Sequence, residues 1–106
     1  MLVMVSNYET GANFERKVVK LLESKGYLAV RCAGSKGPSK IAIVAIPALL
    51  GDQFRTEDIQ LIQCKASGTA SQFEKEQLTN AAQKYGCVAL IASKDKDGQI
   101  IFDLCK

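Results

Sequence analysis

The chain has 106 residues, 47% hydrophobic and 24% charged, a composition typical of a globular domain with one core. Fourteen Lys and Arg against eleven Asp and Glu give a formal charge of +3, which is compatible with a nucleic-acid partner without indicating one. The chain contains no histidine, so histidine-based acid–base catalysis and histidine metal sites are excluded.

Two further features bear on location and redox chemistry. No apolar run is long enough to span a bilayer and the N-terminus lacks a signal-peptide pattern, so we expect a soluble, intracellular and cytoplasmic protein of prokaryotic, archaeal or viral origin, without a membrane partner. The four cysteines form no C-x-x-C pair and lie in apolar strand contexts, which predicts buried free thiols in place of a zinc site or disulfides. They are Cys32, Cys64, Cys87 and Cys105.

The N-terminal part of the chain predicts one helix after a loose lead-in over residues 1–9. Within residues 12–25, apolar side chains such as Phe14 and Val18 recur at the spacing of one helix face. Gly26 follows, as expected for a helix end.

Three strands are predicted next. Residues 27–33 are apolar and β-branched, and they are followed by a loop over residues 34–40 that is rich in Gly, Ser and Lys. Residues 41–46 are almost continuously apolar, which is typical of a strand covered on both faces. Residues 59–65 form the third predicted strand.

The C-terminal part predicts a helix between strands. Ser71 and Glu74 have the spacing of a capping box, and the helix that they open is ended by Gly86. Short strands are predicted over residues 87–92 and 99–104, separated by a charged turn.

The resulting order, α-β-β-β-α-β-β, predicts an α/β fold with a mixed β-sheet and helices packed on the sheet, in a single domain over residues 1–106. The strand over residues 59–65, the helix and the strand over residues 87–92 form a right-handed crossover, so these two strands should be parallel. The first three strands have short connections and should be antiparallel.

The chemistry of the middle strands points to phosphodiester cleavage. Without histidine, such cleavage at neutral pH most readily uses a divalent cation held by oxygen ligands, with a lysine nearby. Two adjacent strands are enough to hold such a site, with one acid on the first strand and an acid-x-Lys motif on the second. Side chains alternate between the two faces of a strand, so the second acid and the lysine lie on the same face. Gln63 and Lys65 have this spacing, Ala42 begins the neighbouring strand, and Glu15 of the first helix can add an acid.

These motifs together resemble the archaeal-type Holliday junction resolvases, a family of the Asp–Glu-x-Lys, restriction-endonuclease-like nucleases. The resemblance covers about residues 11–92, and its motifs occur in the right order. The matching stretches are Gly11-Ala12-Asn13-Phe14-Glu15-Arg16-Lys17-Val18-Val19, Gly26 to Arg31, Gly34-Ser35-Lys36-Gly37, Ile41 to Ile46, Leu61 to Ser67, and the helix with Gln77, Leu78 and Ala81.

The resemblance implies a restriction-endonuclease-like fold and a homodimer that binds four-way junction DNA and nicks opposing strands with Mg²⁺ or Mn²⁺. It implies that Glu15 helps to hold the metal or its water, that Lys65 is the catalytic lysine, and that Ser35 approaches the cleaved strand. Arg16 and Arg31 would contact phosphates near the scissile bond. From the residues alone, spacing favours Glu15 and Arg16 as ordinary solvated residues of an amphipathic helix, and Arg31 can equally be an edge-strand residue paired with an acid.

The loop over residues 34–40 has two readings from its composition. It can be a plain flexible connection, or it can bind phosphate through backbone amides freed by Gly and Ser, with help from Lys36 and Lys40.

The sequence departs from the family pattern at both carboxylates. The family's Asp falls at Ala42, which offers no ligand, and its Glu falls at Gln63, which keeps an uncharged side-chain oxygen. The chain is therefore either an engineered inactive variant or a natural homologue that binds DNA without cutting it. We favour the first because the residues around position 42 retain the pattern of a catalytic site. A duplex-cleaving restriction or repair nuclease of the same fold, and an interaction domain unrelated to nucleic acid, remain as alternatives.

Overall fold

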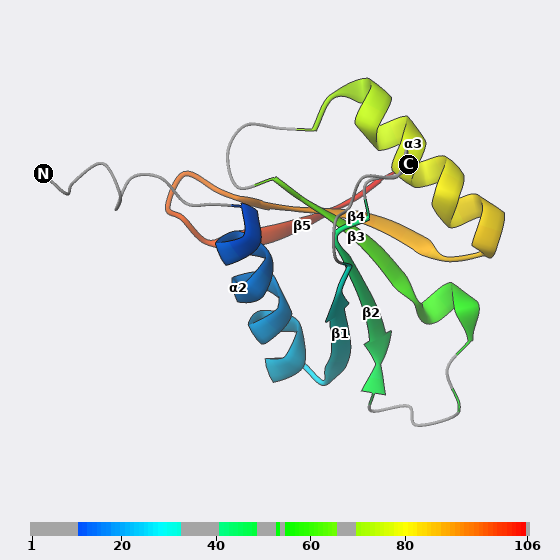
Figure 1. Ribbon diagram of the computed structural model, residues 1–106, viewed down its shortest axis with the longest axis horizontal. Coiled ribbons are helices and arrows are strands. Elements are labelled where there is room, and N and C mark those ends of the chain that lie inside the picture. The colour runs from blue at the N-terminus through cyan, green and yellow to red at the C-terminus, as the bar shows by residue number, and fades with distance from the viewer. Residues whose placement is uncertain (1–10, 33–40, 49–52, 54, 66–69, 106) are drawn as a thin grey trace, which may run out of the picture.

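Five strands form one mixed sheet in chain order, β1-β2-β3-β4-β5, with helix α2 beside β1 and helix α3 beside β4 (Figure 1). The computed structural model describes residues 11–32, 41–48, 53, 55–65 and 70–105. The helices and strands are α2 (Gly11–Ser24), β1 (Tyr27–Arg31), β2 (Ile43–Pro47), a short 3-10 helix (Thr56–Asp58), β3 (Gln60–Lys65), α3 (Gln72–Tyr85), β4 (Val88–Lys94) and β5 (Ile100–Leu104).

The strand directions confirm the predicted α/β topology. Strands β1 and β2 are antiparallel, as are β2 and β3, whereas β3 and β4 are parallel and are joined by the α3 crossover. Strand β5 returns antiparallel to β4. The predicted lead-in over residues 1–9 and the loop over residues 34–40 lie outside the described residues.

Strand β3 is covered on both faces. Ile62 packs with Phe14 and Val18 in the cluster under α2, whereas Leu61 packs with Leu78 in the cluster under α3. Phe14, Val18, Ile62 and Leu78 are all fully buried. Period-two alternation therefore assigns Ile62 to the α2 face and Leu61 to the α3 face, and it fixes the register of the residues that follow.

Helix α3 begins and ends as the sequence predicts. Ser71 Oγ accepts a hydrogen bond from the Glu74 N–H at 3.1 Å, and Glu74 Oε1 accepts one from the Ser71 N–H at 2.9 Å, which completes the capping box. Gly86 ends the helix with φ of 74°, in the left-handed region that glycine adopts without strain.

Three strand boundaries differ from the prediction by two residues. Strand β1 ends at Arg31, where the sequence predicts residue 33. Strand β2 starts at Ile43, two residues later than predicted, and β4 continues to Lys94, two residues later than predicted. The extension follows from the tight β4–β5 turn, in which the Asp95 carboxylate accepts hydrogen bonds from the N–H groups of Asp97 and Gln99, each at 2.9 Å. Because these bonds close the turn directly after Lys94, the antiparallel pairing of β4 with β5 extends to Lys94 and Ile100.

The prediction of buried cysteines is only partly right. All four thiols are free, but each is only half-buried. Three of them lie just outside the strands, at the positions following β1, preceding β4 and following β5. Within the described part of the chain, no helix is both long and apolar enough to cross a membrane.

Candidate active site at one end of the sheet

The candidate residues converge on one end of the sheet because of the strand directions. The C-terminal ends of β1, β3 and β4 and the start of β2 all lie at this end. Arg31 ends β1 and Lys65 ends β3, and their ion-pair partners are Glu15 from the N-terminal half of α2 and Glu74 from the first turn of α3. Parts of the chain far apart in sequence thus supply one site.

Glu15 and Arg31 form an ion pair on the α2 side of the sheet. Arg31 Nε donates to Glu15 Oε1 at 3.2 Å, and the two side chains are 36% and 18% exposed, respectively. Arg16 is exposed and donates from Nη1 to Asn13 Oδ1 at 3.1 Å. Ion pairs near a protein surface contribute only about 0–1 kcal/mol to stability, so this pair adds little to the free energy of folding.

Ala42 lies in a β-bulge where β2 begins. Its N–H donates to the carbonyl of Ile62 at 2.8 Å, although the register pairs Ile62 with Ile43. Two successive residues therefore face one residue of β3, which is the geometry of a bulge. Ala42 is 4% exposed and packs in the cluster under α2. The bulge also explains why β2 begins later than the apolar run predicts.

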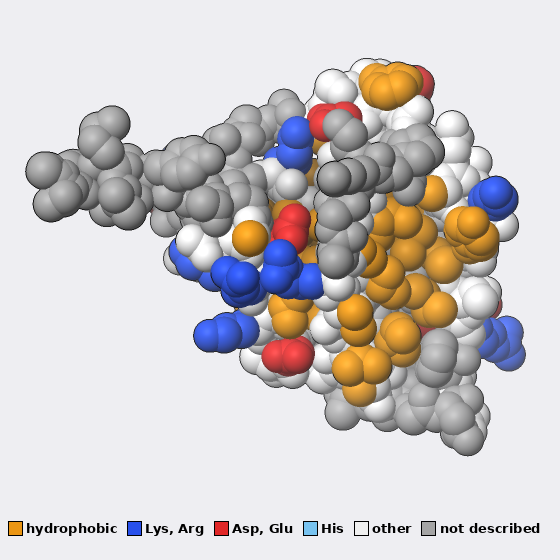
Figure 2. Space-filling view, viewed as in Figure 1, with side chains coloured by type: hydrophobic (Ala, Val, Ile, Leu, Met, Phe, Trp, Pro, Cys, Tyr) orange, Lys and Arg blue, Asp and Glu red, His pale blue; other side chains and the backbone are white. Residues whose placement is uncertain are grey.

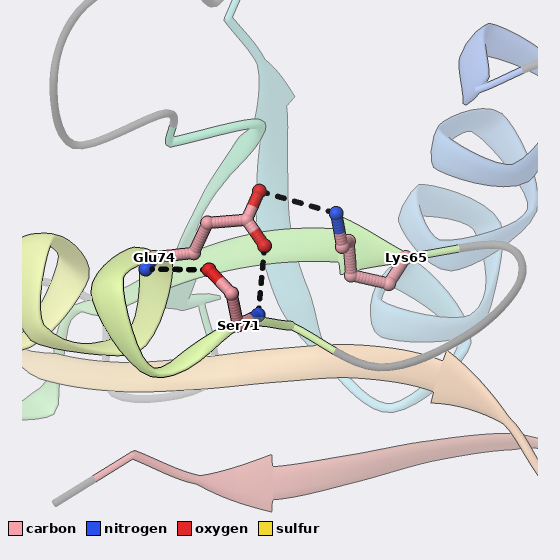
Figure 3. Close-up of polar contacts among 3 residues, drawn as sticks. All are labelled: Lys65, Ser71 and Glu74. Atoms are coloured by element: carbon pink, nitrogen blue, oxygen red, sulfur yellow. Dashed lines mark hydrogen bonds and ion pairs between the residues drawn. The ribbon is translucent and has the colours of Figure 1, made fainter.

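Gln63 and Lys65 lie two and four residues after Leu61 on β3. Side chains at every second position share one face of a strand, so both lie on the α3 face with Leu61. Gln63 is 5% exposed, and its Oε1 has no hydrogen-bond partner among the described residues. Lys65 Nζ lies 3.2 Å from Glu74 Oε2, and the two side chains are 28% and 17% exposed, respectively. Figure 3 shows Glu74 reaching from the first turn of α3 to Lys65 while it also caps the helix at Ser71.

Electrostatics place Glu15 near β3 as well. Burial, and secondly the negative charge of Glu15, raise the pKa of the Cys64 thiol to about 12. The same two causes raise the pKa of the Cys32 thiol. Cys64 lies between Gln63 and Lys65 on β3. The Glu15 carboxylate therefore raises the pKa of a thiol at the end of β3, although Glu15 belongs to the α2 side of the sheet, opposite to Gln63 and Lys65.

Comparisons with known proteins identify the family. A family model described as "Archaeal holliday junction resolvase (hjc)" matches residues 6–104. The chain belongs to this family. It is 28% identical over 103 residues to a protein from Methanocaldococcus jannaschii named "Crossover junction endodeoxyribonuclease Hjc", covering 93% of this chain and 68% of the relative. It also resembles the crystal structure of Archaeoglobus fulgidus Hjc, titled a Holliday junction resolvase, with a TM-score of 0.68 and 29% identity over 92% of this chain and 74% of that one.

This member of the resolvase family has an incomplete set of metal ligands at the sheet end. Among the residues that the structure describes, no three His, Cys, Asp or Glu side chains gather into a metal site. The oxygen ligands available from the predicted set are the Glu15 carboxylate and the orphaned Gln63 Oε1, and Ala42 adds none. Glu15 lies on the α2 side of the sheet and Gln63 on the α3 side, and a hard cation usually takes one or two carboxylates and fills its other positions with water.

Two charged residues at the candidate site were missed by the sequence analysis. Glu74 had only a capping role there, and Lys94 was assigned to a turn. Lys94 instead ends β4 beside the end of β3, with Nζ 5.6 Å from the centre of the Phe14 ring. One signal for Glu74 existed: an acid in the first turn of a helix, only nine residues after the strand lysine. Ser35, Lys36 and Lys40 lie outside the described residues.

Proposed function

We propose that this chain binds four-way DNA junctions as a homodimer, on a scaffold built to nick opposing strands by metal-dependent phosphodiester hydrolysis. The observation that carries the proposal is the convergence of Glu15, Arg31, Gln63 and Lys65 on one end of the sheet, around the bulge at position 42. We infer that Ala42 leaves the present chain inactive or strongly impaired, since it stands where the family's Asp would be.

Each side chain has a role that follows from its position. The Lys65 ammonium adds positive charge at the end of β3, where the scissile phosphate would lie, and Arg31 and the exposed Arg16 supply further phosphate contacts. Glu15 and the Gln63 oxygen would hold Mg²⁺ or Mn²⁺. When bound, that ion would offset charge on the phosphate and activate the attacking water. Ser35, Lys36 and Lys40 would approach the cleaved strand from the loop before β2.

Recognition would depend on backbone charge and junction shape. Basic side chains at the site outnumber residues suited to reading base edges, and Figure 2 shows Lys and Arg side chains gathered over α2 with acidic side chains next to them. Phosphate contacts fix the position of a protein on DNA without reading its sequence. We infer an intracellular protein whose residues 1–106 form one domain that acts on DNA by this route.

Junction binding at two salt concentrations tests the proposal. With Arg16, Arg31 and Lys65 from each of two subunits, affinity for a four-way junction should fall about a thousandfold between roughly 50 and 200 mM salt. A gel-shift titration in EDTA should also show tighter binding to the junction than to a duplex of the same sequence. Equal affinity for both would favour a duplex-cleaving nuclease, and no binding to either would favour an interaction domain without a DNA role.

An exposed apolar sheet face supports the homodimer. Leu28 and Val30 are 52% and 51% exposed, and alternation directs them away from Ala29, which packs under α2. Helix α3 contacts β3 and β4, so within the described part of the chain neither helix covers Leu28 and Val30 on β1, and Figure 2 shows hydrophobic side chains gathered beside β1 and β2. Because monomers rarely expose large contiguous apolar patches, the face fits a two-fold contact with a second copy.

Val30→Lys should convert the dimer to a monomer at micromolar concentration, because it places two charges in a symmetric apolar contact. Sedimentation velocity measures the change. Ile101→Lys is the matched control, because Ile101 is also an exposed apolar strand residue, at 38%, but lies on the opposite edge strand, β5. A monomeric parent, or a dimer that survives Val30→Lys, would contradict this interface.

A homologue that binds without cutting is a second candidate, favoured by one observation: neither position 42 nor position 63 carries a negative charge. Both candidates predict junction binding, and they separate when the acid at position 42 is restored.

A further inference from the structure

Lys65, at the end of β3, is paired with a carboxylate of the neighbouring helix α3. Glu74 Oε2 lies 3.2 Å from Lys65 Nζ, and the lysine and glutamate side chains are 28% and 17% exposed, respectively (Figure 3). Because charges that are partly buried are screened less by water and salt than exposed ones, the two charges largely cancel each other. The ammonium that the proposed function assigns to a DNA phosphate therefore already has an anionic partner.

The two members of this pair differ in how firmly they are held. Glu74 Oε1 accepts the Ser71 N–H at 2.9 Å, and the Glu74 N–H donates to Ser71 Oγ at 3.1 Å, so the capping box fixes Glu74 at the start of α3. Lys65 is the last residue of β3, and its charge lies at the end of a flexible four-carbon stem. The lysine is therefore the partner that can move, and its ammonium can leave Glu74 while the helix cap stays intact.

We propose that Glu74 competes with DNA for Lys65: it pairs with the ammonium in the free protein and gives it up to a backbone phosphate when DNA binds. The inference rests on the proposed function and adds a restraint on its binding step. An ion pair near a protein surface is weak, whereas the DNA backbone carries a dense row of negative charges and releases counterions when a cation neutralises a phosphate. DNA can therefore take the ammonium from Glu74, but it binds less tightly than it would to an unpaired lysine.

Glu74→Gln separates this role from helix capping. Gln keeps the side-chain oxygen that accepts the Ser71 N–H, and it is the other residue favoured at this position of a capping box, so α3 should begin at the same residue. The substitution removes the charge that competes with DNA. Glu76→Gln is the matched control, because Glu76 is an exposed acid of the same helix and accepts a 3.4 Å contact from Gln72.

The experiment measures binding of the full chain and its variants to a fluorescently labelled four-way junction by anisotropy, in EDTA, between roughly 50 and 200 mM salt. We expect Glu74→Gln to bind about tenfold more tightly than the parent at the lower salt concentration. The plot of log affinity against log salt should steepen by about 0.9 per subunit, the value for one more neutralised phosphate. Glu76→Gln should stay within about twofold of the parent at every salt concentration. A role confined to the helix cap would change the melting temperature and leave the slope unchanged.

A second pair of variants shows whether Glu74 acts through Lys65. In a Lys65→Met chain there is no ammonium to release, so adding Glu74→Gln should change junction affinity by less than about threefold. The difference between the two backgrounds therefore measures the competition for the lysine. An equal gain in both backgrounds would mean that Glu74 repels DNA directly, and it would overturn the inference.

Unchanged or weaker junction binding by Glu74→Gln would also overturn the inference, provided that circular dichroism shows a folded variant. The proposed function would stand in that case, because the parent would still bind the junction. If neither the parent nor Glu74→Gln bound a junction at the lower salt concentration, the proposed function would be refuted and the inference with it. Binding by Glu74→Gln but not by the parent would support the competition in its strongest form.

Discussion

Ala42→Asp is expected to raise Mg²⁺- or Mn²⁺-dependent cleavage of a four-way junction about a thousandfold or more above the present chain. The restored carboxylate would supply the missing principal metal ligand at the start of β2, and three factors of ten correspond to about 4 kcal/mol of transition-state stabilisation. Single-turnover cleavage of an end-labelled junction at saturating protein measures the rate without the contribution of product release.

The position of Ala42 makes a second consequence measurable. Residue 42 is 4% exposed within an apolar cluster, and an ionised carboxylate there is costly unless it is paired or bound to metal. Ala42→Asp should therefore lower the melting temperature in EDTA and regain part of the loss in Mn²⁺. The bulge opposite Ile62 is formed by backbone hydrogen bonds, which do not depend on the side chain of residue 42. The Asp side chain should therefore leave the backbone in the direction that the Ala42 side chain takes now.

Ala42→Asn is the matched control, since it has nearly the size and shape of Asp without its charge. It should give less than about a hundredth of the rate gained by Ala42→Asp. A gain confined to Asp would show that the rest of the site is intact, as expected of an inactivated variant. No gain with Asp would contradict that explanation and favour a homologue that binds without cutting.

The fold was largely predictable because its determinants are local. Phe14 and Val18 mark one helical face, and the Ser71–Glu74 box and Gly86 fix both ends of α3 through bonds within a few residues. The parallel β3–β4 pair follows from the helical crossover between them. The start of β2 was placed two residues early because a bulge depends on the partner strand, and no pattern around Ala42 reveals it.

The candidate site was less predictable, because it depends on contacts between elements. The Glu15–Arg31 pair spans 16 residues of sequence and exists only because α2 packs on β1. The capping role of Glu74 was visible in the sequence, but its contact with Lys65 depends on how α3 docks on β3. The burial of Gln63, and with it the orphaned oxygen, likewise follows from that packing.

Lys65→Met, made in the Ala42→Asp chain, is expected to lower the cleavage rate by about a hundredfold to a thousandfold, the range found when one donor that stabilises developing negative charge is removed at a reacting centre. Junction affinity should fall far less, because each subunit loses only one of several phosphate contacts. Lys20→Met is the matched control, since Lys20 is an exposed lysine of α2. Equal rates for the Lys65 and Lys20 variants would contradict a catalytic role.

A rescue experiment separates the ammonium's own role from its pairing with Glu74. Lys65→Met removes the cation that lies 3.2 Å from Glu74 Oε2, and an ionised Glu74 that is only 17% exposed and has lost this partner can itself disturb the site. If that disturbance caused the rate loss, adding Glu74→Gln to Lys65→Met would restore cleavage while keeping the helix cap. We expect no such restoration, because the reaction needs the positive charge of Lys65 at the phosphate as well as the folded geometry around it. Recovery of the cleavage rate in the double variant would show that Lys65 only maintains the structure of the site by pairing with Glu74 and takes no direct part in catalysis.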